Sequence, residues 1–286
     1  KDAVDVMEPA WLIGVRFLLT GLLMAVLFHR RLRGSLNAGF LGAGLALGAV
    51  TFLAFWVQTV GLADTTPGKN AFLTATYCVI VPFMLWAVAR KRPTVVNVGA
   101  AVLCVAGIGL VSVAAGTLTI GFGDLMTLLC AVFFAAQIIA IARFSQTYDV
   151  LGLTVYQSLF GGMLGLLLGV ATEPFPGLAA VANPDFLLNL AYLVVFASGV
   201  CYVLQNIGRA HVPEAQGSLL LSLESVFGVI ASVLFYGEVV TGRMMVGFVL
   251  IFAAILISEL APQRKKRSAA EPSAAIELEE EPSPAA

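Results

Sequence analysis

Nine apolar segments, each long enough to cross a lipid bilayer, follow one another along the chain. A membrane-spanning helix needs about 20 consecutive, mostly apolar residues. The segments lie at 9–28, 38–62, 67–89, 95–115, 122–141, 151–172, 185–210, 214–236 and 242–260. Apolar residues fill each segment continuously rather than at alternate positions, which is typical of helices and not of transmembrane strands. The sequence therefore predicts an all-α polytopic membrane protein with nine transmembrane helices.

The composition excludes most water-soluble classes. Of the 286 residues, 59% are hydrophobic and 12% are charged, whereas a soluble domain has about a quarter charged residues. Nine of the charged residues lie after Ala261, so few remain to cover a water-facing surface. A soluble enzyme, a nucleic-acid binder and a disordered protein are thereby excluded.

No metal site, disulfide framework or cofactor motif is visible. The four cysteines fall inside apolar segments without a CxxC or Cys/His pattern, which is typical of small core residues. We therefore expect no cofactor and no bound metal.

Positive charges predict the orientation. If the helices alternate in direction, twelve Lys and Arg residues share one side: Arg30, Arg31, Arg33, Arg90, Lys91, Arg92, Arg143, Arg209, Arg264, Lys265, Lys266 and Arg267. The other side has Lys1, Lys69 and Arg243. The positive-inside rule makes the basic side cytoplasmic, which predicts a multi-pass protein of the cell (inner) membrane with a cytoplasmic C-terminus. Residues 261–286 are predicted to form a disordered cytoplasmic tail. Its part 268–286 is expected to be dispensable, while Arg264–Arg267 help hold the cytoplasmic end at the anionic leaflet.

The chain contains an internal repeat. A shift of 147 residues aligns 55–94 with 202–241, with identical residues at six of forty positions, including Gln58/Gln205 and Gly61/Gly208. Several identical residues are expected by chance in so apolar a sequence. The matching order of spans and loops is therefore the stronger evidence for a repeat. The segment 122–141 has no counterpart, and its image would lie ahead of Lys1.

The repeat predicts two halves of opposite orientation. Residues 1–115 form the first half, residues 122–260 form the second, and a helix ahead of Lys1 would complete ten helices in two five-helix halves. An odd number of helices per half makes the repeat inverted, and inverted repeats carry their substrate site near the midplane, where the halves meet.

Short motifs resemble those of the drug/metabolite transporter superfamily, EamA family, over about residues 3–260. The matching pieces are Glu8-Pro9, 16–19, Gly61-Leu62, 69–73, Val81-Pro82, 123–125, Leu223-Glu224, Gly237-Glu238, Thr241 and Gly247. The resemblance implies ten helices in two inverted halves and the export of amino acids, related metabolites or drugs. Ser225 follows Glu224 where the family usually has proline, so we expect a straighter helix there.

Two charged residues inside predicted spans are candidates for substrate binding or coupling. Glu224 lies about ten residues into its span, where a carboxylate costs about 2.5–3.5 kcal/mol on insertion scales. It could couple transport to protons or hold a substrate ammonium group. Arg16 could form an ion pair with Glu224 or extend to the outer interface. The alternative for Glu224 is a structural ion pair or a neutral, hydrogen-bonded acid.

Polar and aromatic residues supply the other candidates. Gln58 and Gln205 are equivalent in the repeat, and Gln157 lies near the image of Arg16; amides can bind a polar ligand or join packed helices. Aromatic side chains could line a cavity or pack in the core: Phe55, Trp56, Tyr202 (the image of Phe55) and Tyr77 (the image of Glu224). Lys69 and Asn70 begin a helix at the outer face, either as a solvated cap or as part of the site.

Rows of small residues at every fourth position predict close helix packing. They are Gly44/Gly48 and Gly161/Gly165/Gly169, and such rows let helices approach closely.

The functional prediction is a membrane transporter that works by alternating access. Its expected partners are a small-molecule substrate and the lipid bilayer, with protons as a candidate coupling ion, and we expect a monomer or weak dimer. The alternatives are a receptor or scaffold subunit and an intramembrane enzyme. The sequence has no GxSxG, HExxH or paired-aspartate motif, so an enzyme is disfavoured.

Overall fold

The computed structural model describes residues 6–32, 37–90, 92–112, 120–177, 181–211 and 214–260, without the side chains of 31, 89, 209–222 and 259–260. Within these ranges every regular element is a helix. The predicted all-α fold is confirmed. The predicted tail at 261–286 lies outside the described residues.

The first half contains the helices predicted from the apolar segments. They are α1 (Pro9–Leu27), the short α2 (His29–Leu32), α3 (Ala38–Ala63), α4 (Pro67–Ala75), α5 (Tyr77–Ala89) and α6 (Val95–Ser112). Local chemistry fixes several starts. The Asn37 side chain accepts a hydrogen bond from the Phe40 amide, Thr66 caps α4, and proline stands in the first turn of α1 and α4.

The predicted second half also consists of helices. Its helices are α7 (Phe122–Phe144), α8 (Val150–Thr172), α10 (Pro184–Tyr192), the π-helix η1 (Leu193–Val200), α11 (Cys201–His211), α12 (Glu214–Tyr236) and α13 (Gly242–Leu260). Asp149 caps α8 by accepting from the Gly152 amide. Every predicted span corresponds to described helix, within a few residues at each end.

Two predicted spans are not uniform helices. The segment 67–89 divides into α4 and α5 at Thr76, whose hydroxyl donates to the Leu73 carbonyl at 2.6 Å. The segment 185–210 comprises α10, η1 and α11, with a π-helical stretch in the middle. The helix α12 runs unbroken through Ser225, as expected from serine in the place of proline.

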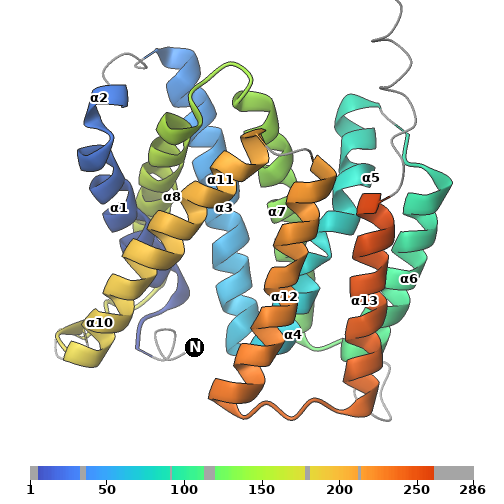
Figure 1. The fold of residues 1–286 in the computed structure, drawn as a ribbon. Helices are drawn as coiled ribbons and strands as arrows, with labels where there is room; N and C mark the ends of the chain where they lie inside the picture. The colour runs from blue at the N-terminus through green and yellow to red at the C-terminus, as the bar shows by residue number, and fades with distance from the viewer. Residues whose placement is uncertain are drawn as a thin grey trace, which may run out of the picture.

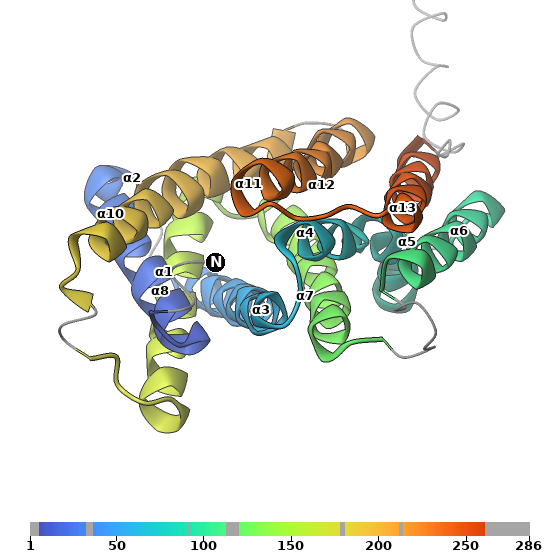
Figure 2. The same ribbon diagram turned by 90° about the horizontal axis from the view of Figure 1, so that it is seen from below.

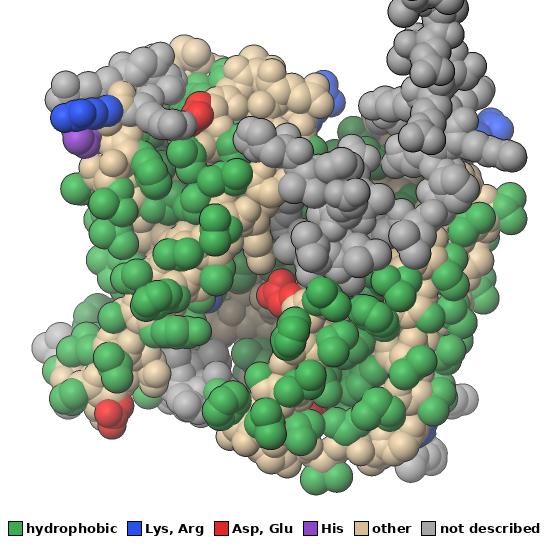
Figure 3. All heavy atoms as spheres, viewed as in Figure 1, with side chains coloured by type: hydrophobic (Ala, Val, Ile, Leu, Met, Phe, Trp, Pro, Cys, Tyr) green, Lys and Arg blue, Asp and Glu red, His purple; other side chains and the backbone are tan. Residues whose placement is uncertain are grey.

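Helix length and surface agree with a membrane location. Seven described helical segments are long and apolar enough to span a bilayer, and the two shorter apolar stretches Leu223–Tyr236 and Gly242–Ser258 lie at the last two predicted spans. Large apolar side chains are exposed along α1, α6 and α12, including Val26, Val102 and Phe235, and Figure 3 shows green side chains over much of one face. Such a surface suits lipid rather than water.

Most helix axes lie roughly parallel to one another, and one helical segment lies oblique to them (Figure 1). The arm formed by α10, η1 and α11 crosses in front of α1 and α3. Seen along the bundle, α1, α3 and α8 lie at one end, α4 and α7 in the middle, and α5, α6 and α13 at the other end (Figure 2). The α10–α11 arm and α12 form a row along one side, so the arm crosses the part of the bundle that holds the polar centre described below.

Glycines allow the closest helix contacts. A Cβ built on Gly165 of α8 would lie 2.6 Å from the Gly14 Cα of α1, and one on Gly48 of α3 would lie 2.9 Å from the Gly161 amide of α8. Real Cβ atoms do not approach so closely, so these positions require glycine. The predicted close packing at Gly48, Gly161 and Gly165 is confirmed.

Candidate functional site

A buried hydrogen-bonded cluster centres on the Tyr202 hydroxyl of α11. It accepts from the Gln157 amide of α8 at 2.7 Å and from the Gln137 amide of α7 at 3.1 Å. Thr51 of α3 lies 3.3 Å from the same hydroxyl and accepts a hydrogen bond from Gln157. All four side chains are buried. The cluster therefore joins four helices through polar side chains in the interior of a membrane protein.

Asn206 extends this cluster toward Thr154. Its amide donates to the Thr154 hydroxyl at 3.0 Å and to the Gln157 carbonyl oxygen at 3.4 Å. The Asn206 carbonyl oxygen is buried and has no hydrogen-bond partner among the described residues. Buried polar atoms usually have partners, so this oxygen can still accept a hydrogen bond from a ligand or a water molecule.

Arg16 of α1 lies beside the cluster. Its Nε donates a hydrogen bond to the Ser198 hydroxyl of η1, and its guanidinium carbon lies 5.1 Å from the ring centroids of both Phe17 and Phe55. Cation–π contacts of this kind contribute about 0.5–2 kcal/mol each. The side chain is half-buried.

The expected ion pair between Arg16 and Glu224 is absent from this structure. Among the described residues the ion pair within 4.0 Å is Lys69–Asp124, and no described carboxylate lies that close to Arg16. Arg16 is held instead by a hydroxyl and two aromatic rings, since α1 packs against the π-helix.

Two hydrogen bonds join the π-helix to α1. Besides the Arg16–Ser198 hydrogen bond, the Thr20 hydroxyl of α1 donates to the Val194 carbonyl at 3.1 Å. The wider i→i+5 bonding of a π-helix changes which backbone groups face a neighbour, and such stretches are frequent at functional sites. The irregular part of the arm thus coincides with the charged residue.

Aromatic rings surround the same region. Phe17 lies 5.0 Å from Phe55, and Tyr202 lies 6.0 Å from Phe17 and 6.1 Å from Phe55 between ring centroids. The series continues from Phe55 to Phe134 at 5.1 Å and on to Tyr77 at 6.3 Å. The candidates Phe55, Tyr202 and Tyr77 therefore belong to one aromatic group that adjoins Arg16.

Trp56 occupies the edge of this group. Its ring stacks on Phe52 at 6.1 Å, one turn away on α3. The Trp56 indole nitrogen is buried without a hydrogen-bond partner among the described residues. Trp56 is therefore part of the aromatic wall and also offers a donor.

Gln58 and Asn70 form a second polar cluster. The Gln58 amide donates to the Thr74 hydroxyl at 3.1 Å, and the Asn70 amide donates to the Thr127 hydroxyl at 2.9 Å and to the Gln58 backbone carbonyl at 3.4 Å. These contacts join α3, α4 and α7. The structure places Gln205 on α11, where its side chain is half-buried, and the described hydrogen bonds of Gln58 are made to other residues.

Glu224 has an exposed side chain on α12. Figure 3 shows the surface hollowed between the α10–α11 arm and α12, so α12 forms one edge of this hollow. The predicted opposition of Tyr77 and Glu224 across the axis of the repeat stays a prediction.

Lys69 forms an ion pair at the predicted outer end of the bundle. Its Nζ lies 2.8 Å from Asp124 Oδ2 at the start of α7, an ion pair rather than an aligned hydrogen bond. The Thr65 hydroxyl donates to the other Asp124 oxygen at 2.7 Å, and the Asp64 carboxylate accepts from the Gly123 amide at 3.2 Å. The α3–α4 corner is thereby fastened to the N-terminus of α7.

Two glutamates fasten the same end of the bundle to helix N-termini. Glu238, between α12 and α13, accepts from the Gly68 amide at 2.9 Å and from the hydroxyls of Thr66 and Ser232. Glu173, after α8, accepts from the Ala10 amide at 2.9 Å and the Trp11 amide at 3.1 Å. Negative groups at helix N-termini are stabilising, so each glutamate holds together helices that are distant in sequence.

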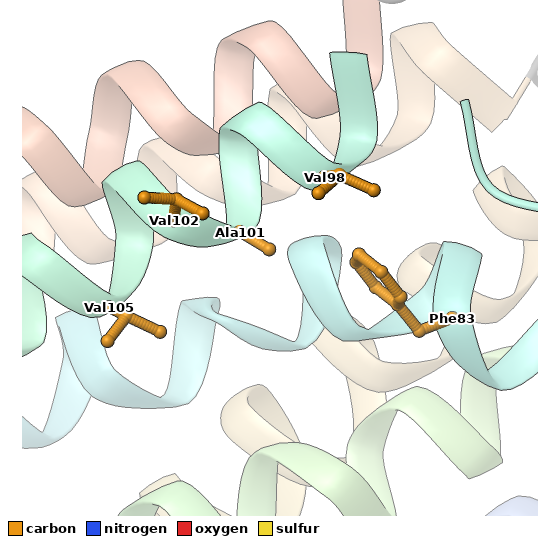
Figure 4. Close-up of a pocket in the computed structure, with 5 residues that line it drawn as sticks. All are labelled: Phe83, Val98, Ala101, Val102 and Val105. Carbon is orange, nitrogen blue, oxygen red and sulfur yellow. The ribbon is translucent and has the colours of Figure 1, made fainter. Parts of the chain in front are cut away.

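An apolar groove lies away from the polar centre. It has a volume of about 280 Å³ between α5 and α6 and is lined by Phe83, Val98, Ala101, Val102 and Val105 (Figure 4). Val98, Val102 and Val105 are exposed on the outside of α6. The groove suits a lipid chain and offers nothing to orient a polar molecule.

Within the described residues no group of three or more His, Cys, Asp or Glu side chains could hold a metal ion. The chemistry available at the centre is hydrogen bonding, one positive charge and aromatic surface.

Sequence patterns missed several residues of the centre, namely Phe17, Thr20, Thr51, Gln137 and Ser198. Small hydroxyl residues in apolar spans carry little signal, because many of them bond only to their own helix. One signal was available: Thr51 and Ser198 are 147 positions apart, the shift that aligns the repeat.

The sequence matches one family model over nearly the whole folded region. The EamA-like transporter family matches residues 1–113 and 121–260. The chain belongs to this family. It is a multi-pass membrane transporter, which implies a small-molecule substrate and a lipid environment.

Relatives of this EamA-family chain carry transporter names. A protein of Archaeoglobus fulgidus named "Uncharacterized transporter" is 30% identical over 261 residues, 91% of this chain and 80% of that protein. The "Uncharacterized transporter YvbV" of Bacillus subtilis is 25% identical over 94% of this chain and 88% of its own length. A solved crystal structure aligns with a TM-score of 0.65 at 16% identity, covering 92% of each chain, and shows the same fold.

Proposed function

We propose that this EamA-family transporter moves a small polar metabolite by alternating access, with the substrate bound at the centre formed by Arg16, Tyr202 and the surrounding aromatic rings. One observation carries the proposal. A half-buried charge and a buried hydroxyl–amide cluster adjoin each other inside the membrane, contributed by α1, α3, α7, α8 and the α10–α11 arm. Ionisable residues inside a membrane are costly, and they mark substrate or ion pathways.

Paired hydrogen bonds support an inverted repeat with halves 1–115 and 122–260. Arg16 of α1 donates to Ser198 of the arm, and Gln157 of α8 donates to Thr51 of α3. The repeat makes α1 equivalent to α8, and the shift of 147 residues makes Thr51 equivalent to Ser198. In the proposed repeat, α1 of the first half is thus linked to the arm of the second half, and α8 of the second half is linked in the same way to α3 of the first half.

Reciprocal packing of α1 on α8 supports the same repeat. A Cβ on Gly21 would meet Leu159, and a Cβ on Gly162 would meet Leu18. A shift of 141 residues converts the first pair into the second. Contacts that exchange in this way are typical of a twofold interface. Helices α6 and α13, a further equivalent pair, also pack closely through Gly107 and Gly247.

Contacts at one end of the bundle support alternating access. Lys69–Asp124, Asp64–Gly123, Glu238–Gly68 and Glu173–Ala10 each connect one proposed half to the other. The positive-inside rule makes this end the outer one. The described conformation is therefore fastened on the outside, and these contacts must separate for the site to open outward.

The direction of transport follows from the family resemblance, which implies export across the inner membrane with a cytoplasmic C-terminus. Glu224 is the candidate for coupling to protons, because it places an exposed carboxylate within a membrane helix. A receptor or scaffold subunit is the alternative, and it requires no movement of small molecules.

A metabolite profile tests the proposed function. Cells that express the full-length gene are compared with cells that carry an empty vector, and intracellular and external metabolites are quantified by mass spectrometry. An exporter depletes at least one small polar metabolite inside the cells and enriches it outside. Identical profiles, with the protein present in the membrane, would favour the receptor or scaffold.

A further inference from the structure

We propose that Arg16 binds the negatively charged group of the transported molecule, and that the substrate is a small organic monoanion with a carboxylate group. This inference rests on the proposed function and deepens it, because it assigns a chemical class to the substrate of the same centre.

The link between α1 and the arm needs no positive charge. Gln157 makes the equivalent link to Thr51 with a neutral amide, whereas Arg16 makes its link to Ser198 with a guanidinium. A guanidinium is far more costly than an amide inside a membrane. The charge of Arg16 is therefore not explained by its hydrogen bond to Ser198.

The described groups in contact with Arg16 carry no opposite charge. No described carboxylate lies within 4.0 Å of it. Phe17 and Phe55 present ring surfaces that attract a cation but carry no net charge. Ser198 is a neutral hydroxyl. Among the described residues, the centre thus has a positive charge beside aromatic rings and no carboxylate in contact with it.

The free edge of the guanidinium fits a carboxylate. Ser198 uses Nε, and the two terminal nitrogens have no hydrogen bond to a described residue. These nitrogens can donate two parallel hydrogen bonds to the two oxygens of one carboxylate. Phe17, Phe55 and Tyr202 then offer an apolar surface to the rest of the molecule.

Charge balance favours a monoanion. One guanidinium compensates one negative charge, whereas a phosphate group carries about −1.5 to −2 at neutral pH. The excess charge of a phosphate would lack compensation in a medium of low dielectric constant. We therefore assign a carboxylate rather than a phosphate.

Ligand-dependent thermal unfolding tests this assignment in the full-length protein reconstituted in lipid nanodiscs. The probes are benzoate, its neutral isostere benzamide, and inorganic phosphate. A ligand that binds the folded state raises Tm, so benzoate is expected to raise Tm and the other two probes are not. The apparent affinity for benzoate is expected to fall about 10- to 100-fold in Arg16→Gln, since hydrogen bonds to charged groups are among the stronger ones. Arg16→Lys should retain part of the effect.

A matched control removes a charge elsewhere. Arg143, exposed at the end of α7, is replaced in Arg143→Gln, and this variant should bind benzoate as the parent does. An equal Tm shift from benzamide or phosphate, or a benzoate shift that persists in Arg16→Gln, would overturn the proposal.

A second measurement needs no variant and covers the case in which Arg16→Gln fails to fold. Phenylglyoxal modifies accessible arginines, and mass spectrometry reports the modified fraction of Arg16 in the parent protein. Benzoate should protect Arg16 but not Arg143, and absence of selective protection would overturn the proposal.

The metabolite profile separates failure of this inference from failure of the proposed function. A neutral or cationic exported compound with unchanged flux in Arg16→Gln would refute the carboxylate assignment and leave transport intact. Arg16-dependent benzoate binding without any exported compound would support the anion site and contradict the proposed transport.

Discussion

Arg16 Nε donates a hydrogen bond to the Ser198 hydroxyl and thereby joins α1 to the π-helical part of the α10–α11 arm. In the proposed repeat, the Gln157–Thr51 bond between α8 and α3 has the equivalent place in the other half. Because hydrogen bonds are stronger in the low-dielectric interior between packed helices, these two links hold the centre in one arrangement. A conformational change of either half must move them.

Removal of the Tyr202 hydroxyl is expected to impair transport while the protein still folds. Tyr202→Phe leaves the amides of Gln137 and Gln157 without their shared acceptor, which costs about 1–3 kcal/mol of unfolding free energy. Uptake assays and chemical denaturation measure the two effects. Tyr192→Phe, at an exposed tyrosine on α10, is the control and should behave like the parent. Equal flux in both variants would show that Tyr202 is not part of the site.

Loss of the outer contacts is expected to favour an outward-open state. Glu238→Gln removes the negative charge that accepts from the Gly68 amide, and Glu173→Gln does the same at the start of α1. Each charge at a helix N-terminus contributes about 0.3–1 kcal/mol. Cysteines placed in the centre should react faster with an impermeant thiol reagent applied from outside.

Asp185→Asn provides the matched control for the outer contacts. Asp185 is an exposed carboxylate in the first turn of α10, so its loss should not change the labelling rate. Unchanged labelling in Glu238→Gln and Glu173→Gln would show that these contacts do not keep the outer end closed.

Close packing predicts opposite effects for two glycine-to-alanine changes. Gly165→Ala forces α1 and α8 apart, because its Cβ would lie 2.6 Å from the Gly14 Cα. Gly99→Ala on α6 meets nothing within 4 Å and removes a helix-destabilising glycine, for a gain of about 0.5–1 kcal/mol. Thermal unfolding in nanodiscs should show a lower Tm for the first variant and an equal or higher Tm for the second. A Tm for Gly165→Ala at or above the parent value would refute the packing argument.

Glu224→Gln is expected to lower transport strongly without loss of the folded protein. If Glu224 couples transport to protons, parent flux responds to an imposed pH gradient and the variant does not. If Glu224 binds the substrate directly, the half-saturating concentration rises and the pH response is retained. Wild-type flux in the variant at every pH would make Glu224 structural.

Helix positions were largely predictable from the sequence, because a transmembrane helix must satisfy its own backbone hydrogen bonds over a fixed length of apolar residues. The break at Thr76 and the π-helix at Leu193–Val200 were not predicted. The break at Thr76 coincides with a local hydrogen bond to the Leu73 carbonyl, and the π-helix bonds to α1 through Thr20 and Val194. Neither feature leaves a periodic signal in the sequence.

The candidate residues were predictable as a class but not in their pairing. Arg16, Phe55, Gln157 and Tyr202 were selected by polarity or by repeat position, and the structure brings them together. The expected partner of Arg16 was Glu224, chosen by depth in the membrane alone. Depth does not specify which helix faces which, so Ser198 of the arm was missed.

Counterflow of the exported metabolite tests the central claim most directly. Proteoliposomes that contain the full-length protein are loaded with the unlabelled metabolite found in the cellular profile, and entry of the labelled compound is measured. A transporter with its site at the Arg16–Tyr202 centre should accumulate label transiently above equilibrium, and this accumulation should disappear in Tyr202→Phe and persist in Tyr192→Phe. Counterflow of equal size in both variants would contradict the account.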